Sequence, residues 1–217
     1  KSNGTYGAER IAGELRAKGH IINHKRVARL MKELNLVSKI RRVKTRSDQK
    51  VSSAGFVYDN LLARDFNATL PNHKWVTDMT ELNVLNDKIY ISAIMDLYNR
   101  EIISFVISDS PNQALITQTI REAMKHRNLD NLENVIIHSD QGSVYRSFEH
   151  NQLSRELKFI PSMSRKANCW DNAVIESFFS HLKVEFPCHF KFASLKQVKE
   201  DLYKFIDYFN NERSQNR

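Results

Sequence analysis

The stretch Val135-Ile136-Ile137-His138-Ser139-Asp140-Gln141-Gly142 decides the fold, because a short apolar run is followed at once by an acid and a glycine. An apolar, β-branched run of this length predicts a buried strand. Asp140 then lies where that strand ends. Further along, Asn172-Ala173-Val174-Ile175-Glu176-Ser177-Phe178-Phe179-Ser180-His181-Leu182-Lys183 predicts a helix, since every fourth residue from Val174 to Leu182 is apolar. Glu176 lies off this apolar stripe.

A third acid, Asp78, ends the segment Trp75-Val76-Thr77-Asp78, which has the composition of another strand. Between Asp140 and Glu176 there are 35 residues. Acids at the ends of two strands and on one helix can converge on a pair of divalent metal ions. Hard cations such as Mg²⁺ select carboxylate oxygens and leave coordination positions for phosphate. Taken one at a time, each Asp at a strand end is interpreted more simply as a cap or turn residue.

The other elements follow the order of one fold class. Strands are predicted at 75–84, 88–95, 101–108, 135–138 and 157–160, the last ended by Pro161. Helices are predicted from Pro111 onward and at 148–156, 172–183 and 195–210. Short turns join the first three strands, so these form an antiparallel meander. The order predicts an α/β, ribonuclease-H-like fold, in which a mixed five-stranded sheet is flanked by helices.

Positive charge is concentrated at the front of the chain. Residues 1–50 hold 14 Lys and Arg against four Asp and Glu, a net charge of +10, whereas residues 51–217 have a net charge of −2. Clustered cations of this kind favour a polyanionic partner such as nucleic acid, although charge runs are more often simply solvated surface.

Two short helices in this basic region predict a helix-turn-helix. The first spans 6–18 and stops at Gly19, and the second is capped by Asn23. The second has an apolar stripe of Val27, Leu30, Met31 and Leu34, which leaves Lys25, Arg26 and Arg29 on its outer face. The alternative is a helical hairpin that braces the following domain without touching DNA.

The chain is therefore divided into a small all-α helix-turn-helix domain at 1–37, a basic linker and arm at 38–71, and an α/β domain at 72–217. Arg41 and Arg42 lie in the linker, where cations can follow a phosphate backbone.

Several function classes are not indicated. No apolar run is long enough to span a membrane, and no Gly-rich phosphate loop indicates ATP use. Cys169 and Cys188 are too few for a disulfide framework and favour a reducing compartment. Their spacing with His181 and His189 fits no closed zinc pattern. The first residue is Lys1 rather than Met, so the chain is interpreted as a fragment or a processed form.

These motifs resemble the retroviral-integrase-like transposases of bacterial insertion sequences, specifically the insertion sequence three family. The matching words are Trp75-Val76-Thr77-Asp78-Met79-Thr80, His138-Ser139-Asp140-Gln141-Gly142, Ser162-Met163-Ser164-Arg165-Lys166 and the run from Asn172 to Glu185. The resemblance covers nearly the whole chain. It implies that Asp78, Asp140 and Glu176 are catalytic metal ligands for two Mg²⁺ or Mn²⁺ ions.

The resemblance also implies residues around the acids. Arg165 and Lys166 are expected to touch DNA phosphates from a loop before the glutamate helix. Lys183, seven residues after Glu176, is expected to contact a phosphate next to the scissile bond, with a solvated lysine as the alternative. His138 and Asn172 are interpreted as residues that support the acids, and His138 either orients a substrate phosphate or simply packs. Ala167 and Val144 depart from the family pattern, which usually has Gly and Gln there.

The implied activity is DNA cleavage at the ends of an insertion element, followed by strand transfer by the freed 3′-hydroxyl. The implied partner is double-stranded DNA, both terminal repeats and target, bound by a homo-oligomer in the bacterial cytoplasm at the nucleoid. A fusion with the product of an upstream reading frame is also implied. Two alternatives stay open: a catalytically silent, DNA-binding remnant of an element, and a stand-alone ribonuclease-H-like nuclease or retroelement integrase.

Overall fold

The computed structural model describes residues 3–39, 55–166 and 168–214. Its centre is a mixed sheet of five strands: β1 (Lys74–Val84), β2 (Asp87–Asp96), β3 (Glu101–Ser108), β4 (Ile136–Ser139) and β5 (Ile160–Met163). The strand order is β3-β2-β1-β4-β5. Strands β1, β2 and β3 pair antiparallel, whereas β4 pairs parallel with both β1 and β5. The predicted mixed five-stranded sheet is confirmed.

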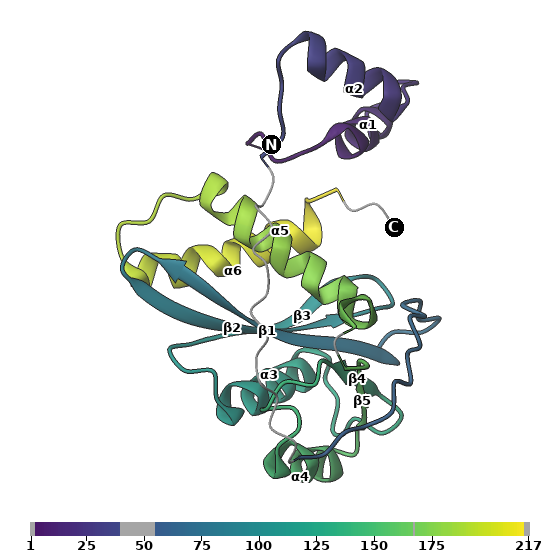
Figure 1. Cartoon of the computed structure of the whole chain (residues 1–217), viewed down its shortest axis with the longest axis vertical. Helices are drawn as coiled ribbons and strands as arrows, with labels where there is room; N and C mark the ends of the chain where they lie inside the picture. The colour runs from purple at the N-terminus through teal and green to yellow at the C-terminus, as the bar shows by residue number, and fades with distance from the viewer. Residues whose placement is uncertain (1–2, 40–54, 167, 215–217) are drawn as a thin grey trace.

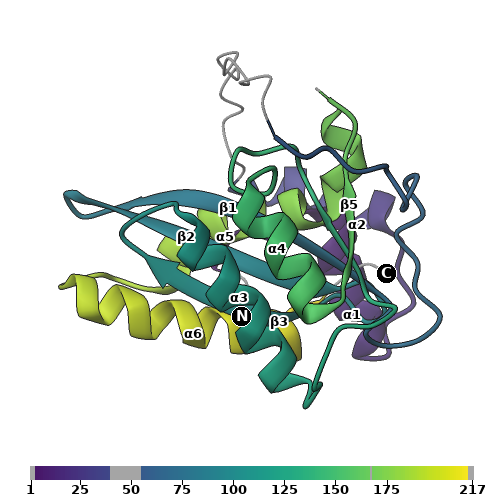
Figure 2. The same cartoon turned by 90° about the horizontal axis from the view of Figure 1, so that it is seen from below.

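Helices cover both faces of this sheet (Figure 1). Helices α5 (Ala173–His189) and α6 (Leu195–Asn211) share one apolar core with the strands, which includes Val76, Phe178 and Phe205. Helices α3 (Gln113–His126) and α4 (Phe148–Leu157) share the core of the other face, which includes Trp75 and Ile116. Figure 2, seen from below, shows α3 and α4 lying across the sheet. Because side chains alternate along a strand, the neighbours Trp75 and Val76 enter opposite cores.

Several element boundaries differ from those predicted, and α5 runs on to His189 instead of ending at 183. The fifth strand is Ile160–Met163 rather than 157–160, because Leu157 is the last residue of α4 and Lys158 ends that helix with a left-handed φ of 64°. Pro161 lies inside this strand. Proline has no N–H, but β5 is an edge strand, so Pro161 is tolerated there. The N–H of Ile160 donates to the carbonyl of Val135 at 2.9 Å.

Helix α3 likewise begins at Gln113 rather than at Pro111. The side chain of Asn112 accepts a hydrogen bond from the backbone N–H of Leu115 at 3.1 Å. An Asn cap of this kind satisfies a backbone donor that has no partner within the helix, so the helix starts after Asn112.

The N-terminal unit consists of α1 (Ala8–Ala17) and α2 (His24–Glu33), joined by a turn in which Gly19 has a φ of +85°. Asn23 caps α2 as predicted and accepts a hydrogen bond from the N–H of Arg26 at 2.9 Å. The expected apolar stripe of α2 is covered only at its start, since Val27 is buried whereas Leu34 is 66% exposed. Two short helices offer each other too little surface to bury a longer stripe.

This unit lies next to α5 and α6 (Figure 1). The hydroxyls of Tyr6 and Tyr208 are 3.1 Å apart, and Arg10 forms an ion pair with Glu185 of α5 at 3.1 Å. Predicted linker residues Arg41 and Arg42 lie outside the described residues.

Residues 56–73 form an irregular arm that runs along the α/β domain. The N–H of Phe56 donates to the carbonyl of Arg146 at 2.9 Å, and the N–H of Met163 donates to the carbonyl of Asp59 at 3.3 Å. The side chain of Leu62 is buried in the core. The arm is therefore part of the domain it borders. Among the residues that the structure describes, none of the helices has both the length and the apolar character needed to cross a membrane.

Candidate active site

Asp78 and Asp140 occupy equivalent positions on neighbouring strands. The parallel pairing of β1 with β4 places Val76 opposite His138. Asp78 comes two residues after Val76, and Asp140 comes two residues after His138. Adjacent strands lie about 4.8 Å apart, and residues two apart point to the same side. Asp140 follows the end of β4 as predicted. Asp78 lies inside β1, not at its end, because β1 continues to Val84 by pairing with β2.

Backbone N–H groups orient both carboxylates. Asp78 Oδ1 accepts a hydrogen bond from the N–H of Met79 at 2.7 Å, and Asp140 Oδ1 accepts one from the N–H of Gly142 at 2.8 Å. Both acids are partly exposed. Carboxylate oxygens held in this way are the ligands that hard cations select.

Tyr145 is buried in the core beside Thr77, close enough to both acids for their charges to act on it, and the sequence did not predict this. Its ring is 1% exposed and its hydroxyl is 3.4 Å from Thr77 Oγ1. Burial raises the pKa of Tyr145 well above its usual value, and the charges of Asp78 and Asp140 raise the pKa further. The effect of both charges on one phenol agrees with the strand register, which places the two acids on adjacent strands.

Glu176 lies in the first turn of α5, and α5 packs on β1. The residue before the helix, Asn172, is 1% exposed and its side-chain amide donates to the carbonyl of Thr77 at 3.4 Å. This contact anchors the start of the helix next to Asp78. Asn172 thus acts on the backbone that carries the acids.

A metal-binding cluster of three or more His, Cys, Asp or Glu side chains is not present among the described residues. Glu176 therefore does not join the two aspartates in a ready-made three-carboxylate cluster. The donor set itself fits a hard divalent cation, because Asp78 and Asp140 offer oriented, partly exposed oxygens from adjacent strands.

His138 is fully buried behind this site. Its Nδ1 is 2.8 Å from Ser162 Oγ. Burial lowers the pKa of His138 to about 4, against the opposite effect of Asp171, so the imidazole is neutral at pH 7. With no exposed surface, this side chain packs β4 against β5 and does not reach a substrate phosphate.

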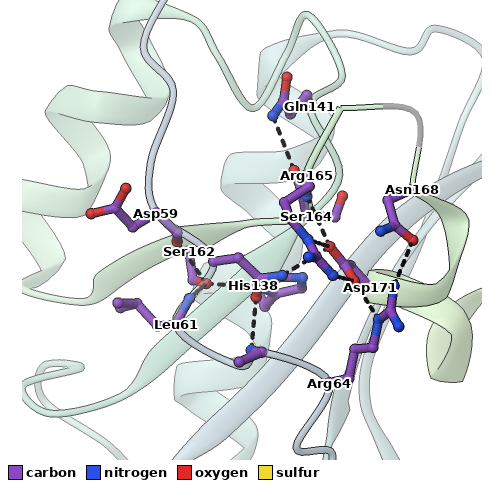
Figure 3. Close-up of polar contacts among 12 residues, drawn as sticks. Asp59, Leu61, Arg64, His138, Gln141, Ser162, Ser164, Arg165, Asn168 and Asp171 are labelled. Carbon is purple, nitrogen blue, oxygen red and sulfur yellow. Dashed lines mark hydrogen bonds and ion pairs between the residues drawn. The ribbon is translucent and has the colours of Figure 1, made fainter.

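The loop before α5 is held by a buried acid that the sequence also did not single out (Figure 3). Asp171 is 0% exposed and accepts hydrogen bonds from Arg165 Nε at 2.8 Å, Arg64 Nε at 2.9 Å and Asn60 Nδ2 at 2.9 Å. Hydrogen bonds from Arg165 lower the pKa of Asp171 well below its usual range. Arg165, predicted to touch phosphate, is therefore ion-paired, although its side chain remains 59% exposed.

The other cations predicted to bind DNA are spread over the molecule. Lys25, Arg26 and Arg29 line one surface hollow with Asn23, and Arg29 also pairs with Glu33 at 3.6 Å. Lys166 is exposed on the loop before α5, and Lys183 is partly exposed on α5 itself. The structure thus places Lys166 and Lys183 around the α5 end of the site and the first three on α2.

Gly142 tests the orientation of Asp140. A Cβ at this position would lie 2.9 Å from Asp140 Oδ1, closer than non-bonded atoms approach. For the DNA cleavage that the family resemblance implies, we expect Gly142→Ala to turn the carboxylate and to lower nicking by about 10²-fold, the effect of a displacement of about 1 Å in a reacting group. The unfolding free energy should change little, because the obstructing atom is the free end of a side chain.

The matched control is Ser143→Ala, at the exposed neighbouring position, which should nick DNA like the unchanged protein. Normal nicking by Gly142→Ala would mean that the orientation of Asp140 has no role in the reaction.

Comparison with known families agrees with this architecture. Two integrase core domain families match residues 68–169 and 176–217, and an HTH-like domain family matches residues 1–44. The putative transposase InsK for insertion sequence element IS150 of Escherichia coli is 39% identical, over 98% of this chain and 74% of that protein. Transposase InsF for insertion sequence IS3A of Escherichia coli is 32% identical, over 95% of this chain and 71% of that protein.

Solved structures show the same fold. A simian T-cell lymphotropic virus intasome matches with a TM-score of 0.57 and 16% identity, over 95% of this chain and 66% of that chain, just under two thirds of its length. The HTLV-2 integrase catalytic core domain in complex with magnesium matches with a TM-score of 0.51 and 16% identity, over 66% of this chain and 90% of that chain. With an integrase core that follows an HTH-like domain and near full-length similarity to these transposases, the chain belongs to the insertion sequence three family of transposases.

Proposed function

We propose that this chain cleaves DNA at the ends of an insertion element and joins the freed 3′-hydroxyl to another phosphodiester. The observation that supports the proposal best is the pair Asp78 and Asp140 on adjacent strands, both close to Tyr145, with Glu176 in the first turn of the helix that packs on β1. Carboxylate oxygens on adjacent strands fit the divalent ions that phosphoryl transfer uses.

Asp78, Asp140 and Glu176 would hold two Mg²⁺ or Mn²⁺ ions. Such ions supply charge stabilisation to the attacking and leaving oxygens of an in-line displacement. The residues of the chain orient this site: Met79 and Gly142 hold the two aspartates by their N–H groups, and Asn172 holds the start of α5. The catalytic core of HTLV-2 integrase, which shares the fold, was solved in complex with magnesium.

Cations on the same helix would position the DNA. Lys183 follows Glu176 by two turns, so the two side chains lie within about 20° of one face and roughly 10 Å apart. At this distance Lys183 is placed for a phosphate next to the scissile bond rather than for a metal ion. Lys166 and the exposed part of Arg165 would meet the backbone nearer the start of the helix, and Arg41 and Arg42 of the linker would meet it elsewhere.

The direct test is incubation of the purified chain with end-labelled DNA that carries the terminal repeats, with and without Mg²⁺. We expect Mg²⁺-dependent nicking at the element end and a joined product, without a covalent protein–DNA adduct. Nicking without joining would favour the stand-alone nuclease, and DNA binding without either reaction would favour the silent remnant.

The helix-turn-helix makes a separate prediction. Lys25→Ala, Arg26→Ala and Arg29→Ala combined should weaken DNA binding and reduce the slope of log affinity against log salt by about one for each phosphate that the protein no longer touches. The control is Lys196→Ala, Lys199→Ala and Lys204→Ala combined, which removes the same charge from α6. Equal slopes for the two variants would favour a hairpin that only braces the α/β domain.

We further propose the division into a helix-turn-helix domain at 1–37, a linker and arm at 38–71, and a catalytic core at 72–217 against which the arm packs. The two ends of an element must be held together for joining, so we propose a homo-oligomer on DNA in the bacterial cytoplasm. A fusion with an upstream reading frame, as the family resemblance implies, would add further recognition of the ends.

A further inference from the structure

Trp170 is exposed, although the two residues that follow it are buried. Its relative exposure is 68%, whereas the other tryptophan of the chain, Trp75, is fully buried. Trp170 belongs to the four-residue 3₁₀ turn η1 (Cys169–Asn172), and Asp171 and Asn172, which follow it, are 0% and 1% exposed. A single exposed apolar side chain is common and does not by itself indicate a binding site. Support for a role of Trp170 must therefore come from the residues around it.

The turn that carries Trp170 is held from two sides. Asp171 accepts hydrogen bonds from the backbone N–H of Arg165 at 3.1 Å, from the side chain of Arg165, from Arg64 and from Asn60 (Figure 3). Asn172 bonds to the carbonyl of Thr77 on β1. An aromatic side chain on a backbone fixed in this way needs little further ordering when it binds a ligand.

The surface around Trp170 is cationic. Arg64 and Arg165 are 49% and 59% exposed, and Lys166 is exposed, whereas the one acid among them, Asp171, is covered. An arginine has five N–H donors, and Arg165 uses two on Asp171, which leaves three for another acceptor. A ring face beside several cations fits a nucleotide, whose base stacks while its phosphate meets the cations.

The loop and turn around Trp170 are also hydrogen-bonded to both acid-bearing segments. Asn172 contacts the carbonyl of Thr77, the residue before Asp78. Gln141, the residue after Asp140, donates from Nε2 to the carbonyl of Ser164 at 3.0 Å, next to Arg165. The turn that carries the indole therefore lies at the border of the proposed site.

We propose that Trp170 is a stacking platform for an unpaired base next to the scissile phosphate, with Arg64 and Arg165 on the flanking phosphates. The base must be unpaired because both faces of a base inside a duplex are covered by its neighbours. This proposal rests on the proposed function in so far as the ligand is DNA. A protein partner is a less fitting occupant, because the exposed aromatic surface is bordered by cations rather than by further apolar residues.

The first measurement is DNA affinity in a double-mutant cycle. DNA ends are prepared with a single abasic nucleotide at each position near the scissile phosphate, and each is bound to the unchanged chain, to Trp170→Ala and to Trp170→Phe. We expect Trp170→Ala to weaken binding of DNA with an unpaired end by about 5- to 150-fold, the range for loss of one stacked base, and Trp170→Phe to retain most of the affinity.

The cycle identifies the base. At one abasic position the DNA affinity of the unchanged chain should fall by a factor similar to that caused by Trp170→Ala. The affinity of Trp170→Ala should not fall further at that position, because the stacking contact is already absent. Tyr203→Ala is the matched control, since Tyr203 is 55% exposed on α6 and should show no coupling to any position. Additive losses at every position would overturn the proposal.

Tryptophan fluorescence gives an independent readout. DNA should quench the emission of the unchanged chain, and Trp170→Phe, which retains only the buried Trp75, should show no quenching. Quenching that persists in Trp170→Phe, or no quenching in the unchanged chain, would contradict stacking.

The two proposals fail separately. If Trp170→Ala is coupled to one abasic position but the chain neither nicks nor joins DNA, the stacking site is supported and the proposed reaction is contradicted. If Mg²⁺-dependent joining is normal but Trp170→Ala is coupled to no abasic position, the reaction is supported and the stacking site is contradicted. Circular dichroism and thermal unfolding of Trp170→Ala should match those of the unchanged chain, because the indole makes no large buried contact.

Discussion

Asp78→Asn, Asp140→Asn and Glu176→Gln are each expected to abolish nicking and joining and to leave DNA affinity nearly unchanged. The amides have the same size as the acids, and the Asn side chains keep an oxygen for the N–H groups of Met79 and Gly142. What they lose is the ligand charge. Metal ions provide several kcal/mol of charge stabilisation, so the loss should be at least about 10³-fold in rate.

The measurements are single-turnover nicking and joining with labelled ends, and DNA binding in the same buffer. Asp130→Asn, at an exposed acid outside the site, is the matched control and should react normally. Near-normal strand transfer by Glu176→Gln would remove the helix acid from the site while leaving the two aspartates. Weak DNA binding by all three variants would instead indicate a folding defect.

Replacement of Glu185 should have the largest effect on stability. Glu185 and Arg213 pair through two hydrogen bonds of 2.8 Å, and both side chains are 2% exposed. Removal of one partner leaves the other charge buried without compensation, which costs about 3–5 kcal/mol. Glu185→Gln should therefore lower the unfolding free energy by about this amount, measured by urea denaturation.

The exposed pair Arg121 and Glu156 provides the control. Its side chains are 50% and 54% exposed, so Glu156→Gln should cost less than about 1 kcal/mol. Equal stabilities of the Glu185→Gln and Glu156→Gln variants would mean that the Glu185 pair is open to solvent.

The stabilisation by Glu185 should also depend on pH. Burial alone would raise the pKa of Glu185, but hydrogen bonding to Arg213 and the charges of Arg213 and Arg10 outweigh burial, so the pKa is lowered. An acid with a lowered pKa in the folded state stabilises fully above its usual pKa, here 4.5, and loses this effect as the pH falls through the lowered value. The difference between the unchanged chain and Glu185→Gln should therefore shrink only in acid.

This pair also connects the two parts of the molecule. Arg10 of α1 reaches Glu185 at 3.1 Å and the ring of His181 at 2.8 Å. Burial lowers the pKa of His181 to about 4, with Arg213 and Arg10 acting in the same direction, so the ring is neutral and can accept from Arg10. Glu185→Gln should therefore also loosen the contact between the N-terminal unit and α5.

Local patterns were enough for the elements and the acids. The period of Val174, Phe178 and Leu182 predicted α5, the β-branched run before His138 predicted β4, and the cap at Asn23 predicted α2. These features depend on residues within one or two turns of each other, so the sequence contains them directly. The spacing from Asp140 to Glu176 also identified the family, because its flanking words lie next to the acids.

Contacts between distant segments were decided only by the tertiary structure. Asp171 is bonded to Arg64, 107 residues before it, and Arg213 is bonded to Glu185, 28 residues before it. Asn210 likewise holds Ile102 of β3, 108 residues away, by two hydrogen bonds of 2.9 and 3.0 Å. The sequence did not predict these contacts. A local hydrophobic period does not show which buried donor will bind which acceptor in a distant segment.

The sequence by itself therefore determined the order of the elements and the fold class, because hydrophobic period and capping are local, and its family words led to the proposal of three catalytic acids. Only the tertiary structure decided that Asp78 lies inside β1 and shares Tyr145 with Asp140, and that Asp171 is covered while Trp170 is exposed. Strand register and burial depend on the packing of segments more than 60 residues apart. The free energy of those contacts is realised only when the whole sheet and its helices are in place.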